Sequence, residues 1–188
     1  MFKQDLILVT DMQKVYLKGE KWACKNIDSA LENIIKLLNK CECEVIFTAF
    51  LPPKSPLGQW KTYNLVNADV NSSPQKSEII DKLKPYTERY PLVFKDRYSS
   101  LSNEKVREAA YNTINNNGRV VLTGVVSECC VLSTAMAAID MGCKVIYLND
   151  AVAGSNKESE KAAGLIIHGM QPVHAKIMAT KDYLKEQT

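Results

Sequence analysis

The chain of 188 residues alternates short apolar runs with longer segments in which apolar residues recur every three or four positions. Short apolar runs are typical of buried strands, and the longer spacing is typical of amphipathic helices. The runs predict strands at residues 6–9, 45–48, 92–94, 119–123, 144–148 and 176–178. The helical spacing predicts helices at about 27–38, 76–84, 103–116, 129–141 and 157–169, and one or two helical turns in the C-terminal tail.

Proline and glycine divide these elements. Pro85 is expected to end the helix at 76–84, while Gly118 and Gly142 are expected to close the helices that precede them. Residues 50–74 contain Pro52, Pro53, Pro56, Gly58 and Pro74 and have little periodicity, which predicts a long loop. Loops of this length in compact domains are often functional.

Strands that alternate with helices and are apolar throughout indicate a parallel sheet covered on both faces. The expected fold class is therefore α/β, with three layers in the order helix, sheet, helix. The length favours one domain over residues 1–188. Neither G-x-G-x-x-G nor a Walker sequence occurs, so a dinucleotide or ATP is not favoured.

Composition and charge exclude several partners. The net charge is +3 and the lysines are scattered, which argues against nucleic acid. The apolar run at residues 6–9 is too short for a signal peptide, and no later run reaches the roughly 18 apolar residues of a membrane span. A cytoplasmic protein without a membrane partner is expected.

The six cysteines are expected to be reduced thiols. The pair Cys41-x-Cys43 is a poor zinc pattern, and only His168 and His174 are available to complete a site. We therefore expect no structural metal and no cofactor.

Reactive side chains follow three of the predicted strands. Asp11 follows the first strand, Lys95 the third, and Cys129 and Cys130 the fourth. Alone, each fits an ordinary turn, surface or packing residue. Because ligands of open parallel sheets bind at the carboxyl ends of the strands, the three together favour a thiol-based site. The residues by themselves do not choose between the two cysteines.

Such a thiol has an electrostatic reason to react. An unperturbed thiol with a pKa near 8.5 is only about 3% thiolate at pH 7. A helix N-terminus and the Lys95 cation are expected to lower the pKa of the thiol, and a shift to about 6 would raise the thiolate to roughly 90%. Asp11 is expected to act as general base and then general acid, and amides of the helix start are expected to bind an oxyanion.

Three motifs resemble the isochorismatase-like cysteine hydrolases. They are the segment from Gly124 to Ala135, Asp11-Met12-Gln13, and Phe94-Lys95-Asp96-Arg97-Tyr98-Ser99. The resemblance covers nearly the whole chain and implies a Rossmann-like sheet of six parallel strands in the order 3-2-1-4-5-6. It also implies that Cys130 is the nucleophile in a triad with Asp11 and Lys95, and that the amides of Val126 and Cys130 form the oxyanion hole. A cis peptide is expected at Val125–Val126.

Two departures within this family narrow the expected activity. Nicotinamidases have an Asp-x-His metal motif after the second strand, whereas this chain has Thr48-Ala49-Phe50-Leu51-Pro52-Pro53. Isochorismatases that cleave a vinyl ether lack the cysteine. The resemblance therefore implies a metal-free relative of nicotinamidase and N-carbamoylsarcosine amidohydrolase, which cleaves a small amide or ureide through a thioester. The alternatives are a vinyl-ether hydrolase that uses Asp11, and a non-catalytic thiol-sensing or binding protein.

The expected substrate-binding residues are Gln13, Tyr16, Phe50, Trp60 and Tyr63. The alternative is that the aromatic residues pack the loop or contact another subunit. Arg97 is expected to form an internal salt bridge rather than to bind a substrate carboxylate. Most relatives are dimers or tetramers, so a homodimer or homotetramer is expected.

Overall fold

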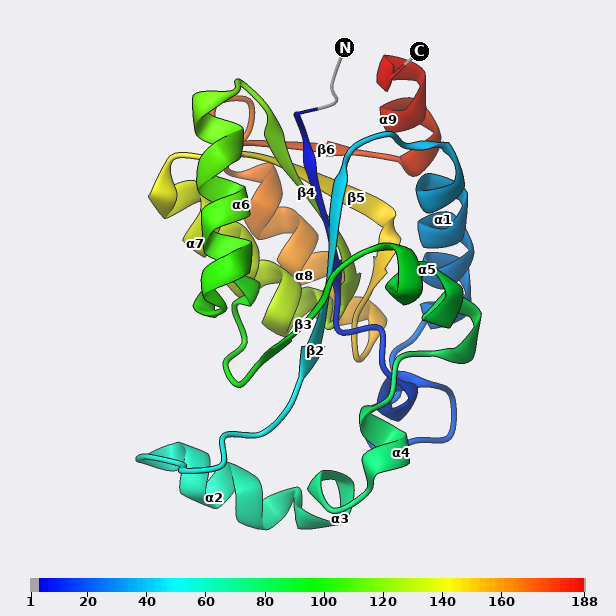
Figure 1. Cartoon of the computed structure of the whole chain (residues 1–188), viewed down its shortest axis with the longest axis vertical. Helices are drawn as coiled ribbons and strands as arrows, with labels where there is room; N and C mark the ends of the chain where they lie inside the picture. Colours follow the sequence, from blue (N-terminus) through cyan, green and yellow to red (C-terminus); the bar gives the residue numbers. More distant parts are fainter. Residues whose placement is uncertain (1–3, 188) are drawn as a thin grey trace.

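The central sheet of the computed structural model, which describes residues 4–187, has six strands that are all parallel (Figure 1). Their order is β3-β2-β1-β4-β5-β6, as predicted. Residues 1–3 and 188 of the predicted domain lie outside the described residues. The strands are β1 (Leu6–Thr10), β2 (Glu44–Phe50), β3 (Leu92–Lys95), β4 (Arg119–Val125), β5 (Lys144–Ala153) and β6 (Ala175–Met178).

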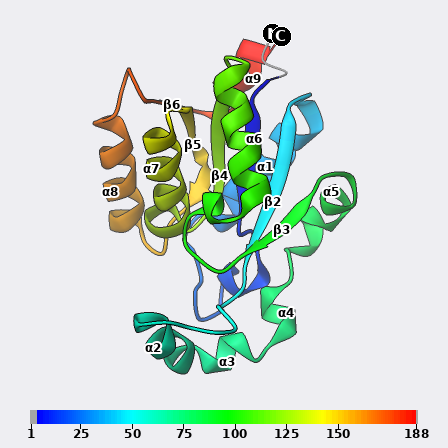
Figure 2. The same cartoon turned by 60° about the vertical axis from the view of Figure 1, so that its left-hand side comes forward.

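Helices cover both faces of the sheet (Figures 1 and 2). One face packs against α1 (Ile27–Lys40) and α9 (Thr180–Gln187), and the other against α6 (Glu104–Asn115), α7 (Leu132–Met141) and α8 (Lys157–His168). Within the described residues, no helix combines the length and apolar character needed to cross a bilayer.

The two faces divide the core because side chains alternate along a strand. In β1, Ile7 and Val9 pack on the α1 side, whereas Leu6 and Leu8 pack on the side of α6, α7 and α8. All four are fully buried. This explains why the strands read as continuous apolar runs.

The region between β2 and β3 differs from the prediction. The predicted loop at 50–74 contains α2 (Gln59–Val66) and α3 (Ala68–Asn71). Helix α2 has no buried residue, so it lacks the apolar stripe that predicts a helix. The predicted helix at 76–84 is instead α4 (Pro74–Ser77), a 3-10 turn η2 (Asp81–Leu83) and α5 (Lys84–Arg89). Pro85 lies in the first turn of α5, where its missing N–H costs no hydrogen bond, rather than at a helix end.

Two boundaries also differ from the prediction. Strand β5 continues to Ala153, five residues beyond the predicted end at 148, through the polar pair Asn149-Asp150. Helix α6 ends at Asn115, and Asn117 rather than Gly118 takes the left-handed conformation, with φ of 55°. Gly142 closes α7 with φ of 98°, as predicted.

Candidate active site

The carboxyl ends of β1, β3 and β4 bring the three predicted reactive residues to one edge of the sheet. Asp11 directly follows β1, Lys95 is the last residue of β3, and Cys130 lies in the π-helical turn η4 (Ser127–Val131) after β4. The ends of β1 and β4 meet closely at Gly124. A Cβ there would lie 2.1 Å from the carbonyl oxygen of Thr10, so the approach requires glycine.

Asp11 and Lys95 form a fully buried ion pair, with 2.6 Å between Lys95 Nζ and Asp11 Oδ2. The Thr48 hydroxyl donates to the other carboxylate oxygen at 2.7 Å. Lys95 Nζ also donates to the carbonyl oxygens of Arg97, at 3.1 Å, and Tyr98, at 3.0 Å. Burial lowers the pKa of Lys95, but the Asp11 carboxylate and Cys130 outweigh it and hold the pKa above its usual value. The lysine is therefore a permanent cation.

The Cys130 thiol is buried beside this pair. Hydrogen bonds and charges from Asp11 and Lys95 both act on it. The predicted lowering of its pKa is wrong: burial, reinforced by the Asp11 carboxylate, raises the pKa of Cys130 well above the usual value, and Lys95 opposes this only in part. The resting side chain is a thiol with a carboxylate beside it, rather than a preformed thiolate.

The turn that carries Cys130 begins at a cis peptide between Val125 and Val126, as expected. The carbonyl oxygen of Val126 accepts hydrogen bonds from the amides of Cys129 and Val131, which leaves the Cys130 amide between them outside this set. The Thr134 hydroxyl donates to the carbonyl oxygen of Cys130 at 2.7 Å. It also accepts from the amide of Ser100 at 2.8 Å, which connects the turn to the segment after β3.

A cavity of about 470 Å³ opens above Cys130. Five of its twelve lining residues are aromatic. The lining residues are Tyr16, Lys21, Trp22, Ala23, Phe50, Tyr63, Tyr98, Val126, Glu128, Cys129, Cys130 and Ser155. A concave, mostly apolar cavity with few polar groups over a reactive thiol is the usual form of a small-molecule site.

Three of the five expected substrate-binding residues line this cavity, namely Tyr16, Phe50 and Tyr63. Trp60 lies behind them, with its ring 6.2 Å from that of Phe50 and 5.1 Å from that of Tyr63. The Arg97 guanidinium lies over the Trp60 ring at 5.3 Å and pairs with Asp96, so it forms the expected internal salt bridge.

Gln13 was expected to bind the substrate, but its side-chain amide is instead hydrogen-bonded to the backbone. Nε2 donates to the carbonyl oxygens of Phe50, at 3.0 Å, and Ser77, at 2.8 Å, and Oε1 accepts from the amide of Phe50 at 2.9 Å. Gln13 therefore holds the end of β2 and does not line the cavity. Sequence reasoning missed Trp22, which lies in a polar segment with no periodic signal.

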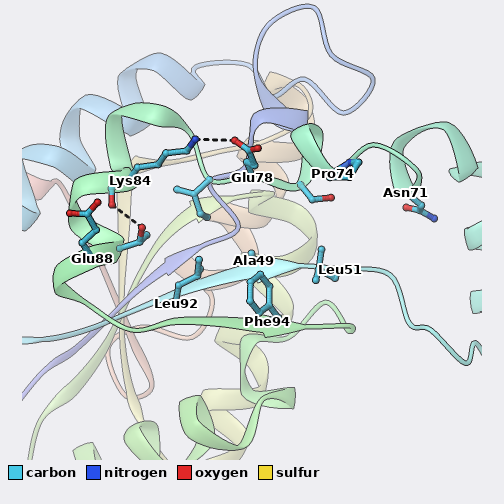
Figure 3. A pocket seen from close by; sticks show the side chains of 12 residues that line it. Ala49, Leu51, Asn71, Pro74, Glu78, Lys84, Glu88, Leu92 and Phe94 are labelled. Carbon is cyan, nitrogen blue, oxygen red and sulfur yellow. Dashed lines mark hydrogen bonds and ion pairs between the residues drawn. The ribbon is translucent and has the colours of Figure 1, made fainter.

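A second cavity, of about 620 Å³, lies beside the ends of β2 and β3 under α4 and α5 (Figure 3). Ala49, Leu51, Leu92 and Phe94 form its apolar wall. None of the three reactive residues lines this cavity, so it is separate from the candidate active site.

The residues at the end of β2 do not fit a metal. The stretch from Phe50 to Pro53 offers no carboxylate or imidazole, and His168 and His174 are exposed at the C-terminal part of α8 and before β6. Among residues 4–187, no group of three or more His, Cys, Asp or Glu side chains is placed to hold a metal ion.

The chain resembles known proteins in sequence and in fold. The family model described as the isochorismatase domain matches residues 5–182. A search of curated proteins finds no matching relative. A cysteine hydrolase from Pseudomonas syringae pv. phaseolicola has 19% identity and a TM-score of 0.82, over 98% of this chain and 92% of that chain.

Two further structures share the fold. An isochorismatase-like hydrolase from Alkaliphilus metalliredigens has 20% identity and a TM-score of 0.73, over 98% of this chain and 99% of that chain. The pyrazinamidase of Pyrococcus horikoshii, in complex with zinc, has 21% identity and a TM-score of 0.69, over 94% of this chain and 99% of that chain. Since the isochorismatase model matches nearly the whole chain, the protein belongs to the isochorismatase family.

Proposed function

We propose that this protein is a cysteine hydrolase that cleaves the C–N bond of a small amide or ureide through a thioester on Cys130. One observation carries the proposal. A thiol with a raised pKa lies against a buried carboxylate that is itself held by a lysine, at the base of an aromatic cavity. A neutral thiol needs a base that takes its proton as it attacks, and Asp11 is such a base.

In the first half of the reaction, Cys130 Sγ attacks the substrate carbonyl carbon and its proton passes to Asp11. The negative charge that develops on the carbonyl oxygen is stabilised by the amides of Val126 and Cys130. The bonding of Val126 supports this role, because its carbonyl oxygen is used by the two amides on either side of the Cys130 amide. The C–N bond then breaks, and the leaving nitrogen takes the proton from Asp11.

In the second half, water attacks the thioester while Asp11 again accepts a proton. The acid is released as the C–S bond breaks, and the proton on Asp11 returns to sulfur. Lys95 stays charged throughout, which supports an electrostatic role: it pairs with Asp11 and stabilises negative charge on sulfur. Its bonds to the carbonyl oxygens of Arg97 and Tyr98 keep Nζ in place.

The proposal is tested by a screen for ammonia release over small amides and ureides, with and without EDTA. We expect at least one compound to be hydrolysed, EDTA to have no effect, and Cys130→Ala to lose activity by about 10³-fold or more. Full activity in Cys130→Ala would instead contradict a thioester on Cys130. Loss of activity with EDTA would contradict the metal-free mechanism.

A further inference from the structure

Buried tyrosine hydroxyls normally find a hydrogen-bond partner within the protein. Two buried tyrosines of this chain follow that rule. The hydroxyl of Tyr147 bonds to Ser127 Oγ at 2.7 Å, and that of Tyr183 donates to Asp5 Oδ2 at 2.9 Å. Tyr16 is 4% exposed, yet within residues 4–187 its hydroxyl has no hydrogen-bond partner. Because its ring lines the cavity above Cys130, that partner has to come from the cavity.

The position of Tyr16 is fixed before any ligand binds. Its amide donates to the carbonyl oxygen of Gln13 at 3.1 Å, and its carbonyl oxygen accepts from the amide of Cys24 at 2.9 Å. Its ring packs against the Trp22 ring at 5.8 Å between centroids. A hydroxyl held on a rigid support loses little freedom when it forms a hydrogen bond, so it discriminates between ligands that offer a partner and ligands that do not.

The hydroxyl of Tyr16 acts as a donor. Burial raises its pKa well above the usual value, and the neighbouring Cys130 and Asp11 raise it further. The phenol therefore keeps its proton throughout the neutral range. Tyr16 and Cys130 line the same cavity, so this donor can serve a ligand whose carbonyl carbon lies at Cys130.

The charges around the cavity disfavour an anionic acceptor. Lys21, in the cavity wall, pairs with Asp69 at 2.7 Å and donates to the carbonyl oxygen of Val66 at 3.0 Å. Lys95 is bound to Asp11. The Glu128 carboxylate, also in the wall, is held by Ser155 and adds negative charge. Lys21 and Lys95 are both already paired with carboxylates, so neither of these lysines is left as an unpaired cation for a ligand carboxylate.

Resting on the proposed function, we propose that Tyr16 is a specificity-determining residue whose hydroxyl donates a hydrogen bond to an uncharged acceptor on the acyl group of the substrate. The acceptor is a ring nitrogen, hydroxyl, ether or carbonyl oxygen near the reacting carbonyl. Amides whose acyl group is purely hydrocarbon leave this donor without a partner in a cavity from which they have displaced water.

Four amides of nearly equal shape test the proposal: benzamide, which has no ring acceptor, and picolinamide, nicotinamide and isonicotinamide, which carry one ring nitrogen at successive positions. Calorimetric titration on Cys130→Ala protein measures their binding without turnover. We expect one pyridine amide to bind about 3- to 10-fold more tightly than benzamide. Adding Tyr16→Phe should abolish that difference, because the pyridine amide loses its donor and benzamide no longer leaves a donor without a partner.

Tyr86→Phe is the matched control, because it removes a hydroxyl that bonds to Asn39 away from the cavity, and it should keep the difference. A difference that survives Tyr16→Phe would overturn the proposal. Equal binding of all four amides to the protein that retains Tyr16, or binding of none, would also overturn the proposal. This result does not depend on whether Tyr16→Phe folds. The amides could bind with the expected selectivity and yet not be hydrolysed by the protein that retains Cys130. That result would refute the proposed reaction and leave the role of Tyr16 intact.

Discussion

Lys95 Nζ lies 2.6 Å from Asp11 Oδ2, and neither side chain is exposed to solvent. Removing one partner of a buried ion pair leaves an uncompensated charge in the interior, which typically costs about 3–5 kcal/mol. We therefore expect Lys95→Met to lower the free energy of unfolding by about that amount. Urea denaturation followed by circular dichroism measures the change.

The double variant Asp11→Asn/Lys95→Met is the control for this prediction. It removes both charges, so it should recover at least about half of the stability lost in Lys95→Met. Both variants should be inactive, because the base is lost or its charge is no longer balanced. Equal stability of Lys95→Met and the wild type would contradict a close ion pair.

The close approach of β1 and β4 at Gly124 gives a second prediction. Gly124 and Gly142 have nearly equal φ values, of 96° and 98°, but a Cβ at Gly124 would meet the Thr10 oxygen at 2.1 Å, whereas at Gly142 the nearest atom is 3.9 Å away. Gly142→Ala should lower the free energy of unfolding by about 1–2 kcal/mol, because alanine disfavours the left-handed conformation. Gly124→Ala should lower the free energy of unfolding by at least about 1 kcal/mol more than Gly142→Ala does, and it should also lower the activity. Equal losses in the two variants would show that β1 and β4 do not meet as described.

The buried thiols predict a loss of stability in alkaline solution. Burial, with a smaller effect of Glu128, raises the pKa of Cys24 to about 12. An unfolded thiol ionises near pH 8.5, so above that pH the folded state retains a proton that the unfolded state loses. The free energy of unfolding should therefore fall as pH rises from about 8.5 toward 12, by up to about 1.4 kcal/mol per pH unit for this group.

Urea denaturation at about pH 8, 9 and 10 under reducing conditions measures this slope. Cys24→Ala should have a shallower slope, because one ionising group is gone, whatever its stability at neutral pH. An identical slope in the two proteins would mean that Cys24 titrates alike in the folded and unfolded states.

The pairing of Lys21 with Asp69 predicts how the protein treats anionic amides. Asp69→Asn leaves Lys21 as an uncompensated cation in the cavity wall. We expect the KM for an anionic amide such as 4-carbamoylbenzoate to fall about 2- to 5-fold, since exposed ion pairs contribute modestly, while the KM for benzamide stays constant. The double variant Asp69→Asn/Lys21→Gln should not show this fall in the KM for the anionic amide, because the cation is gone. An equal fall in KM for both amides would point to a change in the shape of the cavity instead.

The sheet and the positions of Asp11, Lys95 and Cys130 were predictable because buried parallel strands leave apolar runs, and strand ends mark where reactive residues gather. The order of the strands was predicted from the family resemblance, and the structure confirms this order. The helix α2 was not predictable, because it packs none of its side chains into the core and so leaves no periodic signal.

The environment of the site could not be predicted from the sequence, for a different reason. The sign of the pKa shift of Cys130 depends on whether burial or the Lys95 cation has the larger effect, and sequence spacing measures neither. The role of Gln13 likewise depends on contacts with Phe50 and Ser77, which are 37 and 64 residues away along the chain. Trp22 joins the cavity wall through the packing of its ring on Tyr16 and Tyr63 rather than through any pattern of its neighbours.

We propose that Cys130, rather than the exposed Cys129 beside it, carries the acyl group. Intact-protein mass spectrometry after an acid quench, with the best amide from the ammonia-release screen, tests it most directly. We expect a mass increase equal to the acyl group, mapped by peptide digestion to Cys130, absent from Cys130→Ala and still present in Cys129→Ala. An adduct on Cys129, or steady ammonia release by Cys130→Ala at the wild-type rate, would contradict it.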